Sequence, residues 1–498
     1  MADPAMTYSM VDYADVQGLV RFGYGRMTSA SYALVRVKNV AAAKAWLRAA
    51  PVTNAVGKSP PPTTALQIAF TARGLTKLGL PHSMMESFSR EFRTGMSKDY
   101  RARLLGDVDR NAPKHWDWGG PGSEPHLLVM FFAEPEHFDS FVQSTKGNTW
   151  SDAFEEVIWL GTSNLDGDEP FGFADGISQP QIDWEQQRPH TQLEYTNIAA
   201  LGEFLLGYRN EYGKFTDRPL LDPDAANAEL LPAVDAPAKK DLGRNGTYLV
   251  MRQLEQDVRG FWKFLHDQAG GNVVDADQLG AKMVGRTRAG DPLVPIQAES
   301  ISGTEPRTVK QNQFTYEADP AGARCPFGAH IRRANPRNSD FPERRIGALR
   351  KLIIILGFGP KGFYDDLTSS VRFHRILRRG REYGSELSPE QALQPLPAEE
   401  LPRGLHFICL NANISRQFEF LQNAWIASTK FAGLTGESDP LLGNRKPIPG
   451  CPVTGNFKMP SDGTLPRRVS GLPQFVTVRG GAYFFLPSLR ALRYFAGA

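Results

Sequence analysis

The sequence predicts an α+β fold made of two ferredoxin-like domains of the dimeric α/β-barrel type, with helices packed on antiparallel sheets. Two observations predict this class. Strand and helix patterns follow one another in the order strand, helix, strand, strand, helix, strand over residues 1–161. The same pattern restarts after residue 243. We therefore expect an N-terminal domain over 1–220, a linker over 221–243 and a C-terminal domain over 244–498.

The first repeat begins with a strand over 32–37, whose side chains alternate between two faces. Asn39 follows and can cap an alanine-rich helix. The remaining expected elements are strands over 66–70, 126–133 and 155–161, and a helix that carries Phe138, Phe141 and Val142. This order of elements is that of one ferredoxin-like domain.

The stretch 215–243 is rich in Pro, Asp and Ala and lacks hydrophobic periodicity, which favours a linker. Beyond it, a strand over 247–252 precedes an amphipathic helix, and a strand over 405–412 precedes a helix that Asn413 can cap. Two such domains can enclose a cofactor where they meet. A structural duplication with no ligand between its halves is the alternative.

The composition is that of a globular protein, with 57 Lys plus Arg against 54 Asp plus Glu. No long run of like charge supports a nucleic-acid or membrane-surface partner. Cys325, Cys409 and Cys451 form no CxxC pair, which argues against a disulfide framework or structural zinc. No apolar run approaches the roughly 20 residues of a membrane span, and the amino terminus does not resemble a secretory leader. We expect a cytoplasmic protein and leave open whether it forms a homo-oligomer.

The segment CPFGAHIRRANPR, residues 325–337, contains the first candidate site residue. His330 can ligate a metal through one ring nitrogen. Arg332, Arg333 and Arg337 are fixed cations suited to carboxylates, and Arg332 is our candidate for cofactor binding. Iron in a porphyrin with two propionates meets both demands. A core or surface histidine is the alternative interpretation.

Two further segments suit proton transfer between oxygens. GFADGISQP, residues 172–180, is a turn that presents Asp175. Its carboxylate either bonds its own backbone or acts as a general acid and base whose pKa burial would raise. FHRILRRGREYG, residues 373–384, predicts a cationic strand in which Arg378 and Leu377 face opposite sides. A guanidinium beside a carboxylate suits heterolysis of hydrogen peroxide, because the base moves a proton to the departing oxygen and the cation stabilises its charge.

The segments GFADG, CPFGAHIRRANPR and RRGREYG, followed by GLHFICLNA, together resemble the signature motifs of the dye-decolourising peroxidases. Supporting matches are GAKMVGRTRAGDPL, residues 280–293, and FVTVRGGAYFFLP near the end. The resemblance therefore spans most of the chain, and its length resembles that of the longer intracellular bacterial branch.

The resemblance implies haem b at one face of the C-terminal domain, with His330 as the proximal ligand and Asp175 as the distal acid and base. It implies Arg378 as the distal arginine, and not Arg379. The family's arginine lies six residues before the last glycine of its motif, which is Gly384 here.

The same resemblance assigns Leu405 and Phe407 to the apolar roof of the peroxide pocket, with His406 between them pointing away. Glu419 is the candidate acceptor for the second nitrogen of His330, and a solvent-facing helix residue is the alternative. His374 is a rival ligand, because it lies four residues before Arg378 and would share its strand face.

We therefore predict a haem peroxidase that reduces hydrogen peroxide and takes single electrons from phenolic or dye-type aromatic donors. A haem-binding or haem-handling protein without turnover is the alternative, and a related haem enzyme that acts on chlorite is a second one. Bulky dyes would not pass Leu405 and Phe407, so a surface Tyr or Trp would have to relay their electrons.

Overall fold

The computed structural model describes residues 10–188, 196–296, 306–338, 371–447, 453–460 and 465–497. Its N-terminal unit consists of β1 (Ser29–Val37), α1 (Val40–Ala49), β2 (Thr64–Phe70), β3 (Leu127–Ala133), α6 (Phe138–Lys146), α7 (Trp150–Ala153) and β4 (Phe154–Gly161). Asn39 caps α1 as expected, because its side chain accepts a hydrogen bond from the Ala42 backbone N–H at 3.0 Å. The strands pair antiparallel in the order β4, β1, β3, β2.

The C-terminal unit repeats this order. It consists of β11 (Thr247–Gln256), α8 (Val258–Gln268), β12 (Leu377–Arg378), β13 (Arg381–Tyr383), β14 (Gly404–Asn411), two π-helical segments (Ser415–Glu419 and Leu421–Ala427) and β17 (Val476–Leu486). β17 pairs with β11, β11 with β14, and β14 with both β12 and β13. The predicted pair of ferredoxin-like units with antiparallel sheets is thus confirmed.

The cationic segment 373–384 is not the single strand that the sequence predicted. Val371–Phe373 forms a 3₁₀ turn, and the strand is interrupted at Gly380, between β12 and β13. A Cβ at Gly380 would lie 2.4 Å from the His406 carbonyl oxygen on β14. The close approach of the two backbones therefore requires glycine there.

The two units meet in two ways. β17 pairs with β2 through Phe485 and Phe70, which joins all nine strands into one sheet. One face of each half also packs into a shared apolar core, formed by Tyr32, Leu34, Met130, Phe132, Leu249, Met251, Ile408 and Leu410 among others. In the part of the chain that is described, the strands follow an open path from β12 to β4 and do not close into a barrel.

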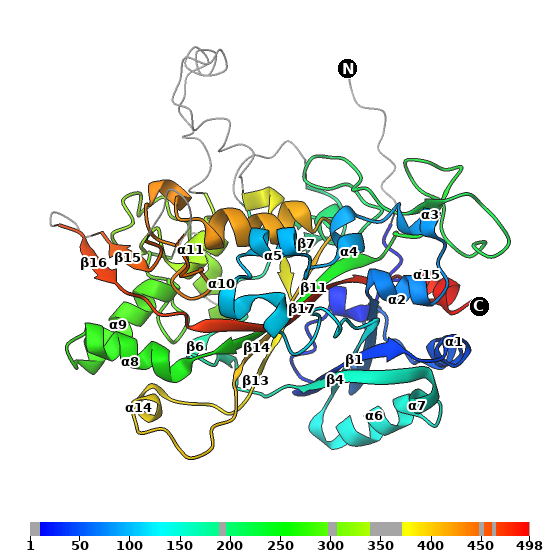
Figure 1. Ribbon diagram of the computed structural model, residues 1–498. Coiled ribbons are helices and arrows are strands. Elements are labelled where there is room, and N and C mark those ends of the chain that lie inside the picture. Colours follow the sequence, from blue (N-terminus) through cyan, green and yellow to red (C-terminus); the bar gives the residue numbers. More distant parts are fainter. Residues whose placement is uncertain are drawn as a thin grey trace, which may run out of the picture.

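Helices cover the other faces (Figure 1). α1, α6 and α7 lie on the N-terminal half, while α8 and α9 (Val273–Val284) flank the far end of the C-terminal half. Between β2 and β3, the chain inserts α2 (Ala72–Lys77), α3 (His82–Met85), α4 (Arg90–Thr94) and α5 (Asp99–Leu105). This insertion crosses onto the C-terminal unit, where the ring of Phe92 lies 5.6 Å from that of Tyr248. An N-terminal segment thus covers part of the C-terminal sheet.

The remaining α-helices and strands are short. They are β5 (Asp168–Glu169), β6 (Phe173–Ala174), β7 (Gln181–Asp183), β8 (Ile198–Ala200), β9 (Leu220–Leu221), β10 (Lys240–Asp241), α10 (Arg307–Asn312), α11 (His330–Ala334), α14 (Pro389–Ala392), β15 (Asn456–Met459), β16 (Arg467–Ser470) and α15 (Leu489–Ala496). β9 and β10 pair across the predicted linker, and the domain limits 1–220, 221–243 and 244–498 stay a prediction.

None of the helices described has both the length and the apolar character needed to cross a bilayer.

Candidate active site

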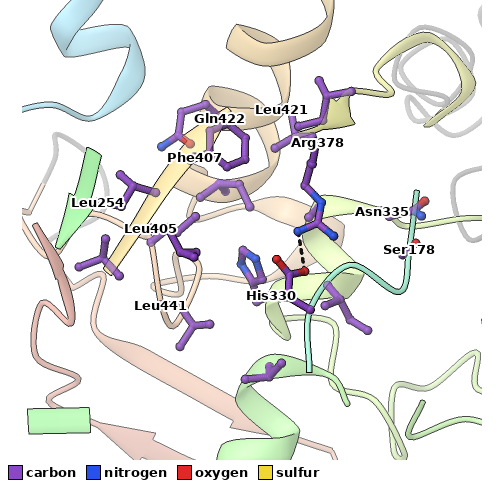
Figure 2. Close-up of a pocket in the computed structure, with 18 of the residues that line it drawn as sticks. Ser178, Leu254, His330, Asn335, Arg378, Leu405, Phe407, Leu421, Gln422 and Leu441 are labelled. Carbon is purple, nitrogen blue, oxygen red and sulfur yellow. Dashed lines mark hydrogen bonds and ion pairs between the residues drawn. The ribbon is translucent and has the colours of Figure 1, made fainter. Parts of the chain in front are cut away.

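A cavity of about 290 Å³ lies on the outer face of the C-terminal sheet, near the lower end of the roughly 300–1,000 Å³ usual for ligand pockets. Its walls come from the GFADG loop, α11, β14 and the π-helical segments. Figure 2 shows Leu405 and Phe407 entering it from β14, with the ring of His330 and the side chain of Arg378 turned toward the same space. Residues far apart in the sequence thus meet in one cavity.

His330 is the first residue of α11, and its orientation is set by Asp439. Its Nδ1 lies 2.9 Å from Asp439 Oδ2, while Oδ1 of the same carboxylate accepts the backbone N–H groups of Leu441 and Leu442, each at 2.9 Å. Because an ionised carboxylate only accepts, Nδ1 carries the proton and donates it, which leaves Nε2 as the nitrogen available to a metal. Burial lowers the pKa of His330, but the Asp439 carboxylate outweighs burial and the net pKa is raised.

Asp175 and Arg378 form an ion pair, with Arg378 Nη1 donating to Asp175 Oδ1 at 2.7 Å (Figure 2). The Asp175 side chain is 42 % exposed, because it lines the cavity. Burial favours the neutral acid, but the charge and hydrogen bond of Arg378 outweigh it, so the pKa of Asp175 is lowered from its ordinary value. Burial thus acts in the expected direction, but the expected net rise of this pKa is wrong, and the carboxylate is ionised at neutral pH.

β14 distributes its side chains as the sequence predicted. Leu405 and Phe407 line the cavity, whereas His406 between them is buried and its Nε2 lies 2.9 Å from the Gly161 carbonyl oxygen. The ring of His406 stacks on that of Tyr383 at 4.5 Å. Burial lowers the pKa of His406 to about 4, so it is a neutral core residue that faces away from the cavity.

The rival residues have other partners. Arg379 donates through Nε to the Leu19 carbonyl at 2.8 Å and through Nη2 to the Val20 carbonyl at 3.1 Å, so it is Arg378 that reaches Asp175. His374 precedes the strand and does not share its face. It does line the cavity, but its Nδ1 lies 2.5 Å from the Arg416 carbonyl oxygen and its ring stacks on Phe420 at 3.7 Å.

Two predicted contacts are wrong. Glu419 does not reach His330, because it is buried and bonded to Arg101 and to the Tyr483 hydroxyl; the acceptor for His330 is Asp439. Arg332 is not among the described residues that line the cavity. Its guanidinium lies between the rings of Tyr316 and Phe327, 4.3 Å from each, and donates to Asp319 at 3.0 Å. Arg332 thus braces the 319–332 segment.

The cavity wall contains other arginines that fit an anionic cofactor edge. Arg286 and Arg337 both line it, and Arg286 is 5 % exposed. Burial, and after it the charge of Arg337, lowers the pKa of Arg286 to about 10. Its Nη2 is buried and has no hydrogen-bond partner among the residues that the structure describes. A carboxylate placed there would satisfy this donor and relieve the repulsion, so the residues present fit a porphyrin with propionates.

The sequence reasoning missed Asp439, Arg286 and Glu169. Arg286 lies within the matched segment 280–293, whereas nothing local distinguishes Asp439 from other turn aspartates. Glu169 lines the cavity, and its carboxylate accepts from the backbone N–H groups of Phe171, just before the GFADG loop, and of Phe173 within it, and from the Gln256 side chain. Burial raises its pKa to about 7. Glu169 thereby shapes the loop that carries Asp175.

Comparison with known proteins gives a consistent result, although no family model matches the chain. The chain is 33 % identical over 356 residues to a multifunctional dye peroxidase of Amycolatopsis sp., which covers 68 % of this chain and 63 % of that protein. It is 29 % identical over 462 residues to a dye-decolorizing peroxidase of Auricularia auricula-judae, with 89 % and 78 % covered.

Solved structures agree with these relatives. The crystal structure of a decolorizing peroxidase from Auricularia auricula-judae is 25 % identical, with a TM-score of 0.72 over 98 % of this chain and 100 % of that chain. A dye-decolorizing peroxidase whose heme pocket was engineered for asymmetric sulfoxidation is 26 % identical, with a TM-score of 0.73 over the same shares.

The fold and the site define a peroxidase, an oxidoreductase that uses peroxide as its oxidant. The chain belongs to the dye-decolorizing peroxidase family, whose members depend on haem. Its place in the longer bacterial branch stays a prediction.

Proposed function

We propose that the chain binds haem b in this cavity and reduces hydrogen peroxide to water while oxidising small phenolic or dye-type aromatic donors in one-electron steps. The observation that carries the proposal is that His330 and the Arg378–Asp175 pair line one cavity, with an apolar wall from Leu405 and Phe407. Membership of a haem-dependent family supports the choice of cofactor.

His330 holds the iron through Nε2, and Asp439 fixes the ring and strengthens the ligand. When bound, ferric haem supplies the metal that holds the peroxide and the electrons that cleave its O–O bond. Asp175, ionised beside Arg378, accepts the proton from the near oxygen and returns it to the departing oxygen, which leaves as water. Arg378 stabilises the negative charge that develops on the departing oxygen.

Arg286 and Arg337 are the proposed partners of the haem propionates, in place of Arg332. Arg337 is held by the carbonyl groups of Asn312 and Phe314 at 3.0 and 2.8 Å, so its guanidinium approaches the cavity in a fixed orientation. Such a pre-organised pair of cations recognises carboxylates at little entropic cost.

Small phenols are the proposed donors, because the cavity is small and largely apolar. A dye-decolorizing peroxidase of the same fold was solved with 2,6-dimethoxyphenol, which makes this phenol a suitable first donor. The proposal keeps the cytoplasmic location predicted from the sequence, which cell fractionation tests.

The test is stopped-flow spectroscopy of the haemin-reconstituted protein mixed with hydrogen peroxide. We expect a Soret band in the parent and in the Asp175→Ala and Arg378→Ala variants, but a peroxide reaction slower by about 10²-fold or more in each variant. Asp222→Ala is the matched control, because Asp222 forms an exposed ion pair with Lys239 and is not among the described residues that line the cavity.

If both variants react as fast as the parent, these two side chains do not act on peroxide and the haem-handling alternative gains. If chlorite, and not peroxide, drives turnover in a parallel assay, the chlorite alternative replaces the proposal.

A further inference from the structure

Tyr316 is the only tyrosine among the described residues that line the cavity, and it packs beside a buried cysteine. Tyr316 is 2 % exposed and Cys325 is 1 % exposed. Both belong to a small hydrophobic cluster, separate from the two large cores, that also contains Val294, Phe314 and Ala329. A phenol and a thiol are therefore packed together at the wall of the cavity in which peroxide is proposed to react.

Asp319 and Arg332 hold these two residues close to each other. The Asp319 backbone N–H donates to the Tyr316 carbonyl at 3.0 Å, and Asp319 Oδ2 accepts from the Cys325 backbone N–H at 2.9 Å. Arg332 Nη1 donates to the Cys325 carbonyl at 2.6 Å, while its guanidinium lies 4.3 Å from the centre of the Tyr316 ring. The two ends of the segment 316–325 thus meet around the same pair of charged side chains.

The Tyr316 hydroxyl is buried and forms no hydrogen bond of regular geometry with the residues that the structure describes. A buried phenol usually has such a partner. Burial, and after it the neighbouring Cys325, raises the pKa of Tyr316 well above its ordinary value, and burial raises the pKa of Cys325 to about 12. Both groups therefore stay protonated at neutral pH, and the thiol does not react as a thiolate. Chemistry at this pair requires an oxidant that removes an electron and a proton together.

A buried cysteine is ordinarily a small apolar residue of the core. Cys409 on β14 fits that description, because it is fully buried and its Sγ lies 3.9 Å from the Asn411 side-chain nitrogen. Cys325 differs from Cys409 in its neighbour, a phenol at the wall of the cavity. This difference makes Cys325 the thiol placed to react when the cavity holds an oxidant.

We propose that Cys325 and Tyr316 become joined by a thioether bond, between Sγ and a ring carbon next to the hydroxyl-bearing carbon, when the haem-loaded protein reacts with hydrogen peroxide. This inference rests on the proposed function, because peroxide reduced in the cavity is the oxidant. The bond closes the segment 316–325, which leads into the helix that begins at His330. The link therefore ties the helix of the proposed iron ligand to the cavity wall.

The atoms and electrons balance with a single molecule of peroxide. The S–H bond of Cys325 and one ring C–H bond of Tyr316 break, and an S–C bond forms. The pair thereby loses two electrons and two protons. The peroxide O–O bond breaks as it takes up these electrons and protons, which yields two molecules of water.

The test is peptide mass spectrometry of the full-length, haem-loaded protein after treatment with hydrogen peroxide in the absence of a donor. Trypsin cleaves after Lys310, Arg324 and Arg332, so Tyr316 and Cys325 lie on the separate peptides 311–324 and 325–332. We expect one linked species whose mass is the sum of the two peptides less two hydrogen atoms. An uncleaved peptide would instead lack one water. Haem-free protein given the same peroxide should yield only the separate peptides.

Two variants remove one partner each. Cys325→Ser removes the sulfur, and Tyr316→Phe keeps the ring but removes the phenol, so both should lose the linked species. Cys409→Ser is the matched control, because it removes a buried thiol that is not among the described residues of the cavity wall, and it should form the link in full. A Soret band in each variant shows that haem is bound.

Separate peptides from a parent protein that consumes peroxide would overturn the proposal. A sulfinic or sulfonic acid at Cys325 in place of the link would do the same, because the thiol would then be oxidised alone. A link formed in haem-free protein would refute the role of the cavity. A parent protein that consumes no peroxide even with 2,6-dimethoxyphenol would instead count against the proposed function.

Discussion

Asp175 lines the cavity, whereas Asp439 lies behind it and holds His330, and the two carboxylates differ in what surrounds them. Both carboxylates pair with a nitrogen base, Asp175 with Arg378 at 2.7 Å and Asp439 with His330 at 2.9 Å. In both, burial opposes ionisation but the partner outweighs it, so both pKa values are lowered. The side chain of Asp439 is fully buried, whereas that of Asp175 is 42 % exposed.

The difference separates a positioning role from a chemical one. The two oxygens of Asp439 are occupied by His330 and by two backbone N–H groups, so this carboxylate can only hold the imidazole in place. Asp175 faces the cavity and can exchange a proton with a small molecule there. Access to the cavity, and not charge, distinguishes the two aspartates.

The largest expected effect concerns the partner of Asp439. His330→Ala should remove the Soret band of haemin-reconstituted protein after gel filtration, because the only proposed iron ligand is lost. His374→Asn is the matched control, since His374 also lines the cavity but its Nδ1 is bonded to the Arg416 carbonyl. An unchanged Soret band in His330→Ala, or loss of the band in His374→Asn, would show that the assignment of His330 as the iron ligand is wrong.

The same substitution at the two aspartates should produce opposite patterns. Asp175→Asn should slow the peroxide reaction by about 10²–10⁴-fold with haem affinity unchanged, because a general base is lost. Asp439→Asn should weaken haem affinity by about 10–100-fold, because the ligand loses its fixed acceptor. Haem titration and stopped-flow rates measure the two effects separately. If both variants changed haem affinity and the peroxide rate equally, Asp175 and Asp439 would not have different roles.

The smallest expected effect is a shift in pH dependence. The lowered pKa keeps Asp175 ionised, so the peroxide rate constant should fall only below the ordinary aspartate pKa of about 3.9. Arg378→Ala removes the largest influences that lower this pKa and leaves the Gly176 backbone hydrogen bond and the charge of His330 to oppose burial, so the pKa should rise and the acid limb should move to higher pH. Arg378→Lys keeps a charge and should move it less. Stopped-flow rates measured against pH test this, and an acid limb at the same pH in all three proteins would contradict it.

Local patterns were sufficient for most of the strands, but not for the interrupted one over 373–384, and for the direction of side chains along them. Period-two alternation correctly places Leu405 and Phe407 on one face and His406 on the other, and it keeps Leu377 away from Arg378. These properties depend on neighbours in the chain, so sequence spacing reports them.

Contacts between distant segments could not be predicted in this way. Glu419 lies on a helical segment close to the cavity wall, so its position in the sequence made it a candidate partner for His330. In the structure, Arg101 from the N-terminal insertion donates a hydrogen bond to the Glu419 carboxylate instead. Arg332 was chosen for its charge, but Tyr316, Phe327 and Asp319 surround it. In both cases a side chain from another part of the chain competes for the same polar group.

The sequence by itself determined the two βαββαβ units, the family motifs, the residue proposed to hold the iron and the two residues proposed to act on peroxide. Only the tertiary structure decided that Asp439 orients His330, that Arg286 and not Arg332 reaches the cavity, and that Asp175 is ionised. The physical reason is that strand pairing and side-chain direction follow from short-range geometry. Burial and charge at a site instead depend on which remote segments pack against it.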